Sequence, residues 1–190
     1  MARPRGFVEE RAVDAAMRAF WAHGYEGTST QDLCEATGLG RSSIYNTFAS
    51  KRELFEKALG RYIELKTAAA LELLGGELPA REKIRTVLWW AVEPDEQDPL
   101  GCLVVNSMVE LAPHDPAIAD RLRRDQEIRL AALVAAIEAG QRAGEIAADK
   151  DAESLARFVV ATISGLRVLA RSGADRAALE SVASTALTAL

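Results

Sequence analysis

The sequence predicts an all-α protein, and three observations support that prediction. Hydrophobic residues make up 49% of the chain and aromatic residues only 6%, and an alanine- and leucine-rich composition of this kind favours helices. Apolar residues recur at intervals of three and four, which is the spacing of one helical face. Capping residues, glycines and prolines divide the chain into about nine helices, with no segment that resembles a strand.

Residues 28–51 are predicted to form two short helices joined by a glycine turn. Ser29 followed by Asp32 fits a capping box, which starts a helix. Gly38 offers the left-handed backbone conformation that ends a helix. The sequence therefore predicts a helix of about two turns before Gly38.

The second short helix is predicted over residues 41–48, with Gly40 as its N-cap. Ile44 and Phe48 have the spacing of an inward face. The outward residues are Arg41, Ser42, Tyr45, Asn46 and Thr47. A short helix with two apolar anchors and an outer face of hydrogen-bonding side chains suits the DNA major groove. The alternative is an ordinary helical hairpin with a solvated outer face.

An upstream helix over residues 7–24 completes a three-helix unit. Its apolar residues are Val13, Ala16, Met17 and Phe20, and it ends at HGY. With the segments FWAHGYEGTST and GLGRSSIYNTFASKRELF, this unit resembles the helix-turn-helix DNA-binding domain of the TetR family of bacterial transcriptional regulators. The resemblance covers roughly the first 60 residues. Cys34 stands where relatives usually have alanine, and we interpret it as a small core residue.

The resemblance implies a homodimeric repressor that a small-molecule inducer releases from a palindromic operator in double-stranded DNA. Thr30 and Lys51, at the starts of two helices, are then expected to bind phosphates. Arg41 is the candidate for guanine and Asn46 for adenine. A helical adaptor that keeps the fold without binding DNA is the rival class.

The charge distribution agrees with a specific DNA-binding protein. The net charge is −5, but residues 1–60 carry eight basic and eight acidic residues, so the excess negative charge lies beyond them. Screening limits charge interactions to about 8 to 10 Å, so the local balance matters most. No run of about 18 apolar residues exists and the first residues lack the apolar core of a signal peptide. Two cysteines give no disulfide framework. These features predict a cytoplasmic protein without a membrane segment.

An enzyme is not expected. The histidines are His23 and His114, and neither has neighbours with metal-ligand spacing. Nucleotide-binding and nucleophile motifs are absent from the sequence. We therefore expect no catalytic residues, no metal and no cofactor.

The rest of the chain predicts a helical body. We place a head at residues 1–50 and a ligand-binding and dimerisation body at residues 51–190. Helices are expected at residues 51–74, 79–93, 99–112, 118–143, 149–172 and 175–190.

Residues 155–170 predict a helix that is apolar on nearly all sides. One face carries Leu155, Val159, Ile163, Leu166 and Ala170, and another carries Phe158, Thr162, Gly165 and Leu169. Such a helix needs two packing partners. It is either a central helix of a monomer or, as the TetR resemblance implies, part of a homodimer interface formed by the last two helices.

The body also supplies candidates for an inducer cavity. Trp89 and Trp90 point about 100° apart on their helix, so we expect one in the core and the other in the cavity. The remaining candidates are Cys102, Asn106, Phe158 and Thr162. The alternative for the polar pair, Asn106 and Thr162, is a hydrogen bond to nearby backbone carbonyls.

Cys102 carries a second hypothesis about the signal. If Asp98 is the N-cap and Pro99 the first helical residue, Cys102 lies in the first turn, where the helix dipole favours a thiolate. An electrophile or oxidant would then release the repressor. Nearby carboxylates and burial oppose a thiolate, so the alternative is an inert core cysteine.

Overall fold

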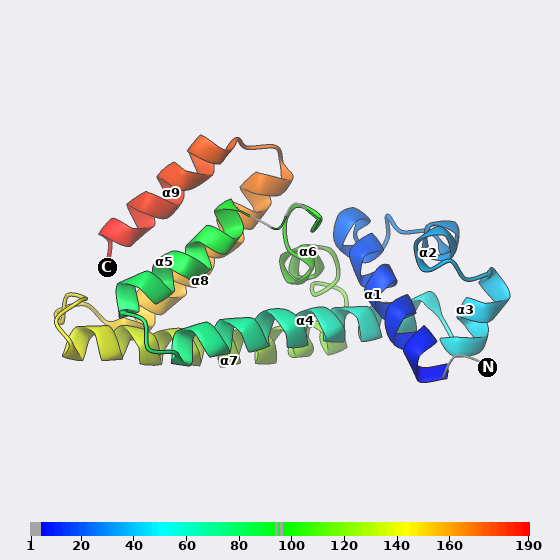
Figure 1. Ribbon diagram of the computed structural model, residues 1–190, viewed down its shortest axis with the longest axis horizontal. Helices are drawn as coiled ribbons and strands as arrows, with labels where there is room; N and C mark the ends of the chain where they lie inside the picture. Colours follow the sequence, from blue (N-terminus) through cyan, green and yellow to red (C-terminus); the bar gives the residue numbers. More distant parts are fainter. Residues whose placement is uncertain (1–4, 94, 96) are drawn as a thin grey trace.

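The computed structural model describes residues 5–93, 95 and 97–190, and every regular element in these ranges is a helix (Figure 1). The helices are α1 (Arg5–His23), α2 (Thr30–Thr37), α3 (Arg41–Thr47), α4 (Lys51–Gly75), α5 (Ala80–Val92), α6 (Leu103–Glu110), α7 (Pro116–Arg142), α8 (Ala152–Arg171) and α9 (Arg176–Thr188). The all-α prediction and the expected nine helices are confirmed for this part of the chain. None of these helices is both long and apolar enough to cross a membrane.

The turn between α2 and α3 forms as predicted. The Ser29 hydroxyl accepts a hydrogen bond from the Asp32 amide, and the Asp32 carboxylate accepts one from the Ser29 amide. Gly38 has a φ of 67°, and Gly40 is the N-cap of α3. The capping box and the left-handed glycine therefore set the limits of α2 locally, before any tertiary contact.

A first hydrophobic core joins α1, α2 and α3, which we call the head, to the beginning of α4. Phe20, Phe48 and Phe55 are fully buried in it, and the rings of Phe20 and Phe55 meet edge to face at 5.1 Å. The same core continues into α6 and the start of α7. The division at residue 50 stays a prediction, since this core extends across it.

Helices α4 and α7 lie side by side and run in the same direction along the long axis (Figure 1). Arg52 pairs with Asp115 near their starts, and further along Thr67 donates to Asp125. The Arg121 side chain crosses from α7 to α4 and lies over Gly60, where a Cβ would displace its guanidinium.

A second hydrophobic core lies at the other end of the molecule (Figure 1). It joins α5, α8 and α9 to the later parts of α4 and α7. The predicted inner stripe of α5 is buried as expected, namely Ile84, Val87, Leu88 and Ala91. The two long helices therefore connect two separate cores.

The predicted start of α6 is wrong. The helix begins at Leu103 with Cys102 as its N-cap, rather than at Pro99 after Asp98. Gly101 has a φ of 91°, so the backbone turns sharply before the helix. The Asp98 carboxylate pairs instead with Lys66 at 3.0 Å and Arg18 at 3.4 Å. Tertiary ion pairs with α1 and α4 thus outweigh local capping.

Two later helices begin up to three residues away from their predicted starts. Helix α7 begins at Pro116 because Asp115 caps it, and α8 begins at Ala152 because Asp151 caps it. Each capping carboxylate accepts a backbone amide three residues on. Both follow the usual rule for N-caps.

Candidate DNA-binding surface and ligand cavity

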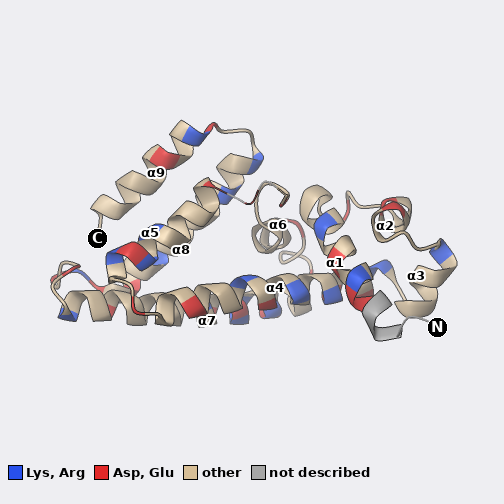
Figure 2. Ribbon diagram, in the orientation of Figure 1, with Lys and Arg blue, Asp and Glu red and all other residues tan. Residues whose placement is uncertain are grey.

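Helix α3 presents a polar face to solvent. Ile44 is 1% exposed and Phe48 fully buried, so both anchor the helix inward as predicted. On the outer face, Arg41, Ser42, Tyr45 and Asn46 are exposed and Thr47 is half-buried. Figure 2 shows a basic segment at the start of α3 and acidic ones on α2. Two buried side chains are enough to fix this short helix and leave its remaining faces free.

A hydrogen bond across the turn joins two of the predicted DNA-contacting residues. The hydroxyls of Thr30 and Tyr45 lie 2.9 Å apart. The Arg41 guanidinium lies 5.9 Å from the centre of the Tyr45 ring. Thr30, Arg41 and Tyr45 therefore form one contiguous surface from α2 and α3.

Lys51 lies at the start of α4, behind this surface. Its ammonium lies 4.4 Å from the centre of the Tyr25 ring, which restrains the side chain by a cation–π contact. The Ser50 hydroxyl caps α4 by accepting the Glu53 amide. A cation next to the free amides of a helix start is suited to a phosphate.

The last turn of α1 is held by helices of the body. Arg171 of α8 donates to the carbonyls of Trp21 at 2.9 Å and Ala22 at 3.0 Å. The Glu110 carboxylate of α6 accepts the amides of Tyr25 and Glu26 at 2.9 and 2.7 Å. The end of α1 and the turn after it are thereby hydrogen-bonded to both α6 and α8.

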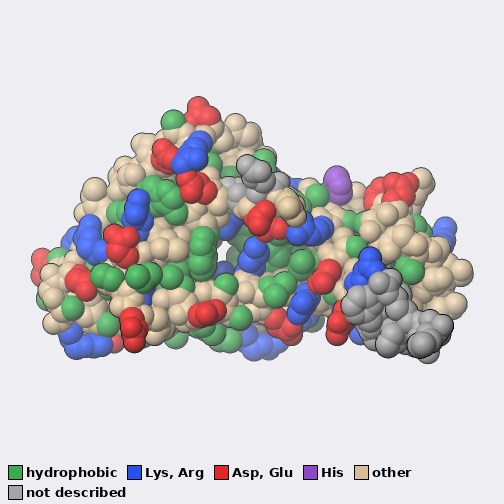
Figure 3. Space-filling model, in the orientation of Figure 1, with side chains coloured by type: hydrophobic (Ala, Val, Ile, Leu, Met, Phe, Trp, Pro, Cys, Tyr) green, Lys and Arg blue, Asp and Glu red, His purple; other side chains and the backbone are tan. Residues whose placement is uncertain are grey.

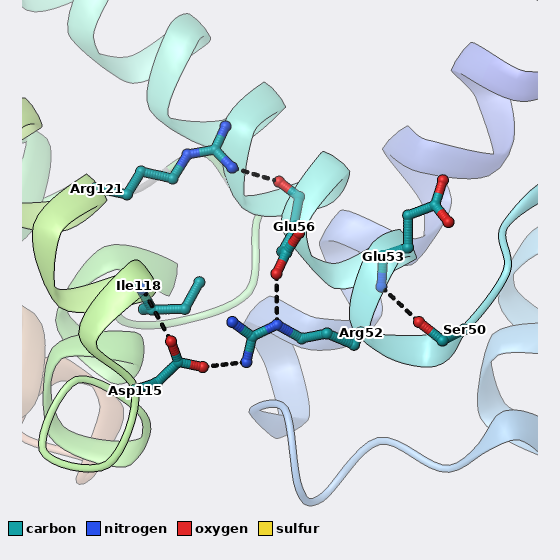
Figure 4. A network of polar contacts seen from close by, with 7 residues as sticks. All are labelled: Ser50, Arg52, Glu53, Glu56, Asp115, Ile118 and Arg121. Atoms are coloured by element: carbon teal, nitrogen blue, oxygen red, sulfur yellow. Dashed lines mark hydrogen bonds and ion pairs between the residues drawn. The ribbon is translucent and has the colours of Figure 1, made fainter.

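A second connection links the head end of α4 to the start of α7 (Figure 4). Arg52 binds both Glu56 and Asp115, while Arg121 donates to the Glu56 carbonyl at 2.9 Å. The hydrogen bond from Arg52 lowers the pKa of Asp115 below its usual value, and the Ile118 amide acts in the same direction. The start of α7 is thus fixed to the first turns of α4 by a charged network.

A cavity of about 380 Å³ lies between the two cores and opens to solvent. Figure 3 shows the hollow, with hydrophobic side chains inside it between α4 and α6. The lining comes from α1, from each of α4 to α8, and from the loop before α6. Its apolar side chains include Leu74, Val87, Trp90, Val104, Leu133, Val160 and Ile163. Its polar side chains include Tyr62, Lys66, Thr67, Asp98, Asp125, Arg129 and Arg167.

Two of the six predicted ligand residues, Trp90 and Cys102, line this cavity. Trp89 does not; it packs against the second core, with the Arg85 guanidinium 5.0 Å from its ring centre. Asn106 donates to the Trp21 carbonyl at 3.4 Å. Trp90 therefore lies at the cavity, whereas Trp89 packs on the second core and stays half-buried.

Phe158 and Thr162 also lie outside the cavity, on the outer face of α8. Phe158 is 43% exposed, and the Thr162 hydroxyl donates to the Phe158 carbonyl at 2.9 Å. This is the backbone hydrogen bond that was the alternative for Thr162.

The environment of Cys102 differs from the predicted one. The residue is an N-cap rather than part of the first helical turn, so the argument from unpaired first-turn amides is wrong. The Tyr62 hydroxyl donates to the Cys102 sulfur at 3.4 Å. Burial raises the pKa of Tyr62 far above its ordinary value, and Cys102 raises it further, so Tyr62 stays protonated.

Sequence reasoning missed most of the cavity lining. Trp21 was part of the predicted head, yet its side chain reaches the cavity of the body. Asp125 is 4% exposed despite its charge, and it binds Thr67 and Arg129. A carboxylate on the inner stripe of a predicted helix was the available signal, because a charged residue is rarely buried without partners.

The outer faces of α8 and α9 carry exposed apolar side chains. Phe158, Leu169 and Val182 are about two-fifths exposed, at 43%, 40% and 39%. A Cβ on Gly165 would meet no atom within 4 Å, so this face has room for a neighbour. Ile163 and Leu166 point elsewhere: Ile163 lines the cavity and Leu166 is fully buried.

Comparison with known proteins gives the family. Residues 12–58 match the family model described as bacterial regulatory proteins, tetR family, and residues 80–186 match the tetracyclin repressor-like C-terminal domain. The chain is 34% identical over 188 residues to the HTH-type transcriptional repressor ComR of Escherichia coli, covering 97% of this chain and 90% of that protein. It is 32% identical to the HTH-type transcriptional regulator YezE of Bacillus subtilis, over the full length of both.

A solved structure agrees over the whole chain. A triple cysteine mutant of the TetR family regulator CifR, complexed with 26-bp double-strand operator DNA, is 33% identical, covers 99% of both chains and gives a TM-score of 0.84. The match extends over head and body alike. This protein therefore belongs to the TetR family of bacterial transcriptional regulators.

Proposed function

We propose that this protein is a homodimeric repressor that binds a palindromic operator and releases it when a small molecule enters the cavity. The observation that carries the proposal is the outer face of α3. It is anchored from below by Ile44 and Phe48, and it is joined to Thr30 of α2 by the Tyr45 hydroxyl. CifR, a relative of 33% identity, has been solved with operator DNA.

The DNA group that each residue is expected to contact follows from its side-chain chemistry. Arg41 can contact guanine and Asn46 adenine through paired hydrogen bonds. Thr30 and Lys51 stand at helix starts and are suited to phosphates. Ser42, Tyr45 and Thr47 complete the surface that enters the major groove.

The cavity is connected to this surface through contacts of the described residues. A ligand there touches Trp21 of α1 and Cys102 at the start of α6. Helix α6 holds the amides of Tyr25 and Glu26 through Glu110. A ligand that displaces α6 therefore moves the end of α1 and changes the spacing of the two heads in a dimer.

The test is a gel shift on DNA from upstream of the protein's own gene. Wild type is expected to shift a palindromic fragment, and Arg41→Ala combined with Tyr45→Ala is expected to abolish the shift. Arg123→Ala serves as a matched control, since this arginine lies on the solvent face of α7. Affinity should fall steeply with salt, because phosphate contacts release counterions. An unchanged shift in the double variant, or none for wild type at low salt, would favour a helical adaptor.

A further inference from the structure

Two residues that line the cavity each carry a buried hydrogen-bond donor without a partner among the described residues. Among the described residues, the buried side-chain polar atoms without a partner are Trp21 Nε1 and Arg129 Nε. Both residues line the cavity, and Trp21 is only 2% exposed. Indole and guanidinium nitrogens donate and do not accept. An unpaired buried donor is unfavourable, so the cavity is suited to an occupant that supplies acceptors.

The cavity also contains a cation without a carboxylate partner. The Lys66 ammonium lies 3.0 Å from Asp98, and the Arg129 guanidinium binds Asp125. Arg167, on α8, forms no ion pair with any described residue, although it lines the same cavity. Its positive charge is therefore available to an occupant.

The unpaired cation and one unsatisfied donor are at the same end of the cavity. The rings of Trp21 and Tyr62 meet edge to face at 4.9 Å. Arg171, one turn after Arg167 on α8, donates to the Trp21 carbonyl at 2.9 Å. Arg167 therefore lies one helical turn from the contact between α8 and Trp21, and both side chains line the cavity.

Three of the four described carboxylates that line the cavity form ion pairs with cations other than Arg167. Asp125 and Asp98 are engaged with Arg129 and Lys66. Glu93 is paired with Arg176 of α9, and Asp95 is exposed. Asp98, Asp125 and Glu93 are therefore paired with cations other than Arg167.

The remaining wall is apolar. Val87, Trp90, Leu133 and Ile163 contribute aliphatic and aromatic surface. A volume of about 380 Å³ is at the lower end of the range for small-molecule sites. This wall fits a compact hydrocarbon portion.

We propose that the inducer is a compact, largely apolar carboxylate. Its carboxylate accepts a hydrogen bond from Trp21 Nε1 and balances the charge of Arg167, while its hydrocarbon portion packs on Trp90 and Leu133. Arg129 Nε offers a second donor to an additional acceptor on the ligand. The role of this ligand as an inducer rests on the proposed function, whereas its chemical class is inferred from the cavity alone.

The test uses three probes that differ only in their polar group: 3-phenylpropanoate, 3-phenylpropanamide and 3-phenylpropylamine. Isothermal titration calorimetry on the full-length protein is expected to rank the acid first, the amide second and the amine last. Arg167→Gln should weaken the acid about tenfold, which corresponds to about 1.4 kcal/mol, and the amide little, because only the acid carries the charge that Arg167 balances. Trp21→Phe keeps an aromatic ring, although a smaller one, and removes the donor, and it should weaken both acid and amide.

Arg123→Gln is the matched control, with its arginine on the solvent face of α7, and it should bind all probes like wild type. Thermal melts without probe show whether each variant folds. Tighter binding of the amine than of the acid, equal loss of acid and amide in Arg167→Gln, or no binding of the acid at millimolar concentration would overturn the ligand class. Operator binding is measured separately without probe, so failure of the repressor function and failure of the ligand class give different results.

Discussion

At the scale of single residues, one pair of hydroxyls joins the two helices of the DNA-binding surface. Tyr45 is 37% exposed, so its ring is placed mainly by α3 and by the 2.9 Å contact with Thr30. A change there affects the surface without touching the core. Loss of this contact is therefore expected to change operator binding without changing the stability of the fold.

Tyr45→Phe is expected to weaken operator binding about threefold to tenfold, the value of one hydrogen bond of about 0.5–1.5 kcal/mol. The melting temperature should stay close to that of wild type, since the ring remains. Fluorescence anisotropy with labelled operator gives the affinity. Thr30→Ser keeps the hydroxyl and is the control; if Tyr45→Phe binds DNA like wild type, the hydroxyl has no part in positioning.

Asp115 gives a prediction about pH. Its pKa is lowered in the folded protein, first by the hydrogen bond from Arg52. A carboxyl with a lowered folded pKa contributes stability above its unfolded pKa of about 3.9, and this contribution is lost as the pH falls through the folded value. Asp115→Asn removes the charge and keeps a capping side chain.

Urea unfolding of wild type and Asp115→Asn should therefore give a difference in unfolding free energy that is constant near neutral pH. The difference should shrink below about pH 4, where the carboxyl begins to be protonated. A difference that does not change with pH would mean that Arg52 does not act on the ionised carboxylate.

At the scale of elements, α8 has a buried inner face and an exposed, partly apolar outer face. Its inner face, with Val159 and Leu166 fully buried, completes the second core. Its outer face exposes Phe158 and Leu169 beside Val182 of α9. Such an apolar patch is suited to the same patch on a second copy, because a two-fold axis pairs identical surfaces.

Leu169→Glu is expected to convert the dimer into a folded monomer, because it places a charge in the interface and leaves the core intact. Light scattering measures the mass, and circular dichroism the helical content. Ile128→Glu changes an apolar residue of α7 that is 51% exposed, and it is the control. A dimer that survives Leu169→Glu would exclude this face as the interface.

At the scale of the whole molecule, residues of both cores line the cavity, and contacts outside the cavity also connect body and head. Arg171 is one of them, since it reaches from α8 to the carbonyls of Trp21 and Ala22. The side chain is not part of the cavity lining. Binding of ligand and its transmission to the head are therefore separable.

Arg171→Ala is expected to leave probe affinity unchanged while the ratio of operator affinities with and without probe moves toward one. The logarithm of that ratio gives the coupling free energy between the sites, commonly about 1–3 kcal/mol. Calorimetry gives the first quantity and anisotropy the second. Arg157→Ala, an exposed arginine on α8, is the control; equal ratios in Arg171→Ala and wild type would place the coupling elsewhere.

The sequence alone determined the features that depend on neighbouring residues. The capping box at Ser29, the left-handed Gly38 and the inward pair Ile44 and Phe48 are local, so α2 and α3 were predictable with their outer face. The family followed from the same segment. The inner stripe of α5 followed from its period, because a helix turns its side chains by a fixed angle per residue.

The tertiary structure alone decided which side chains meet at the cavity. Trp21 belongs to the first core and Leu133 to the second, and only the packing of α4 against α7 brings both to one space. The start of α6 was decided in the same way, since Asp98 pairs with cations of α1 and α4. A local sequence pattern predicts the buried face and the ends of a helix, but not which other helices pack against it. The ligand cavity is formed between packed helices, so the local sequence does not predict its lining.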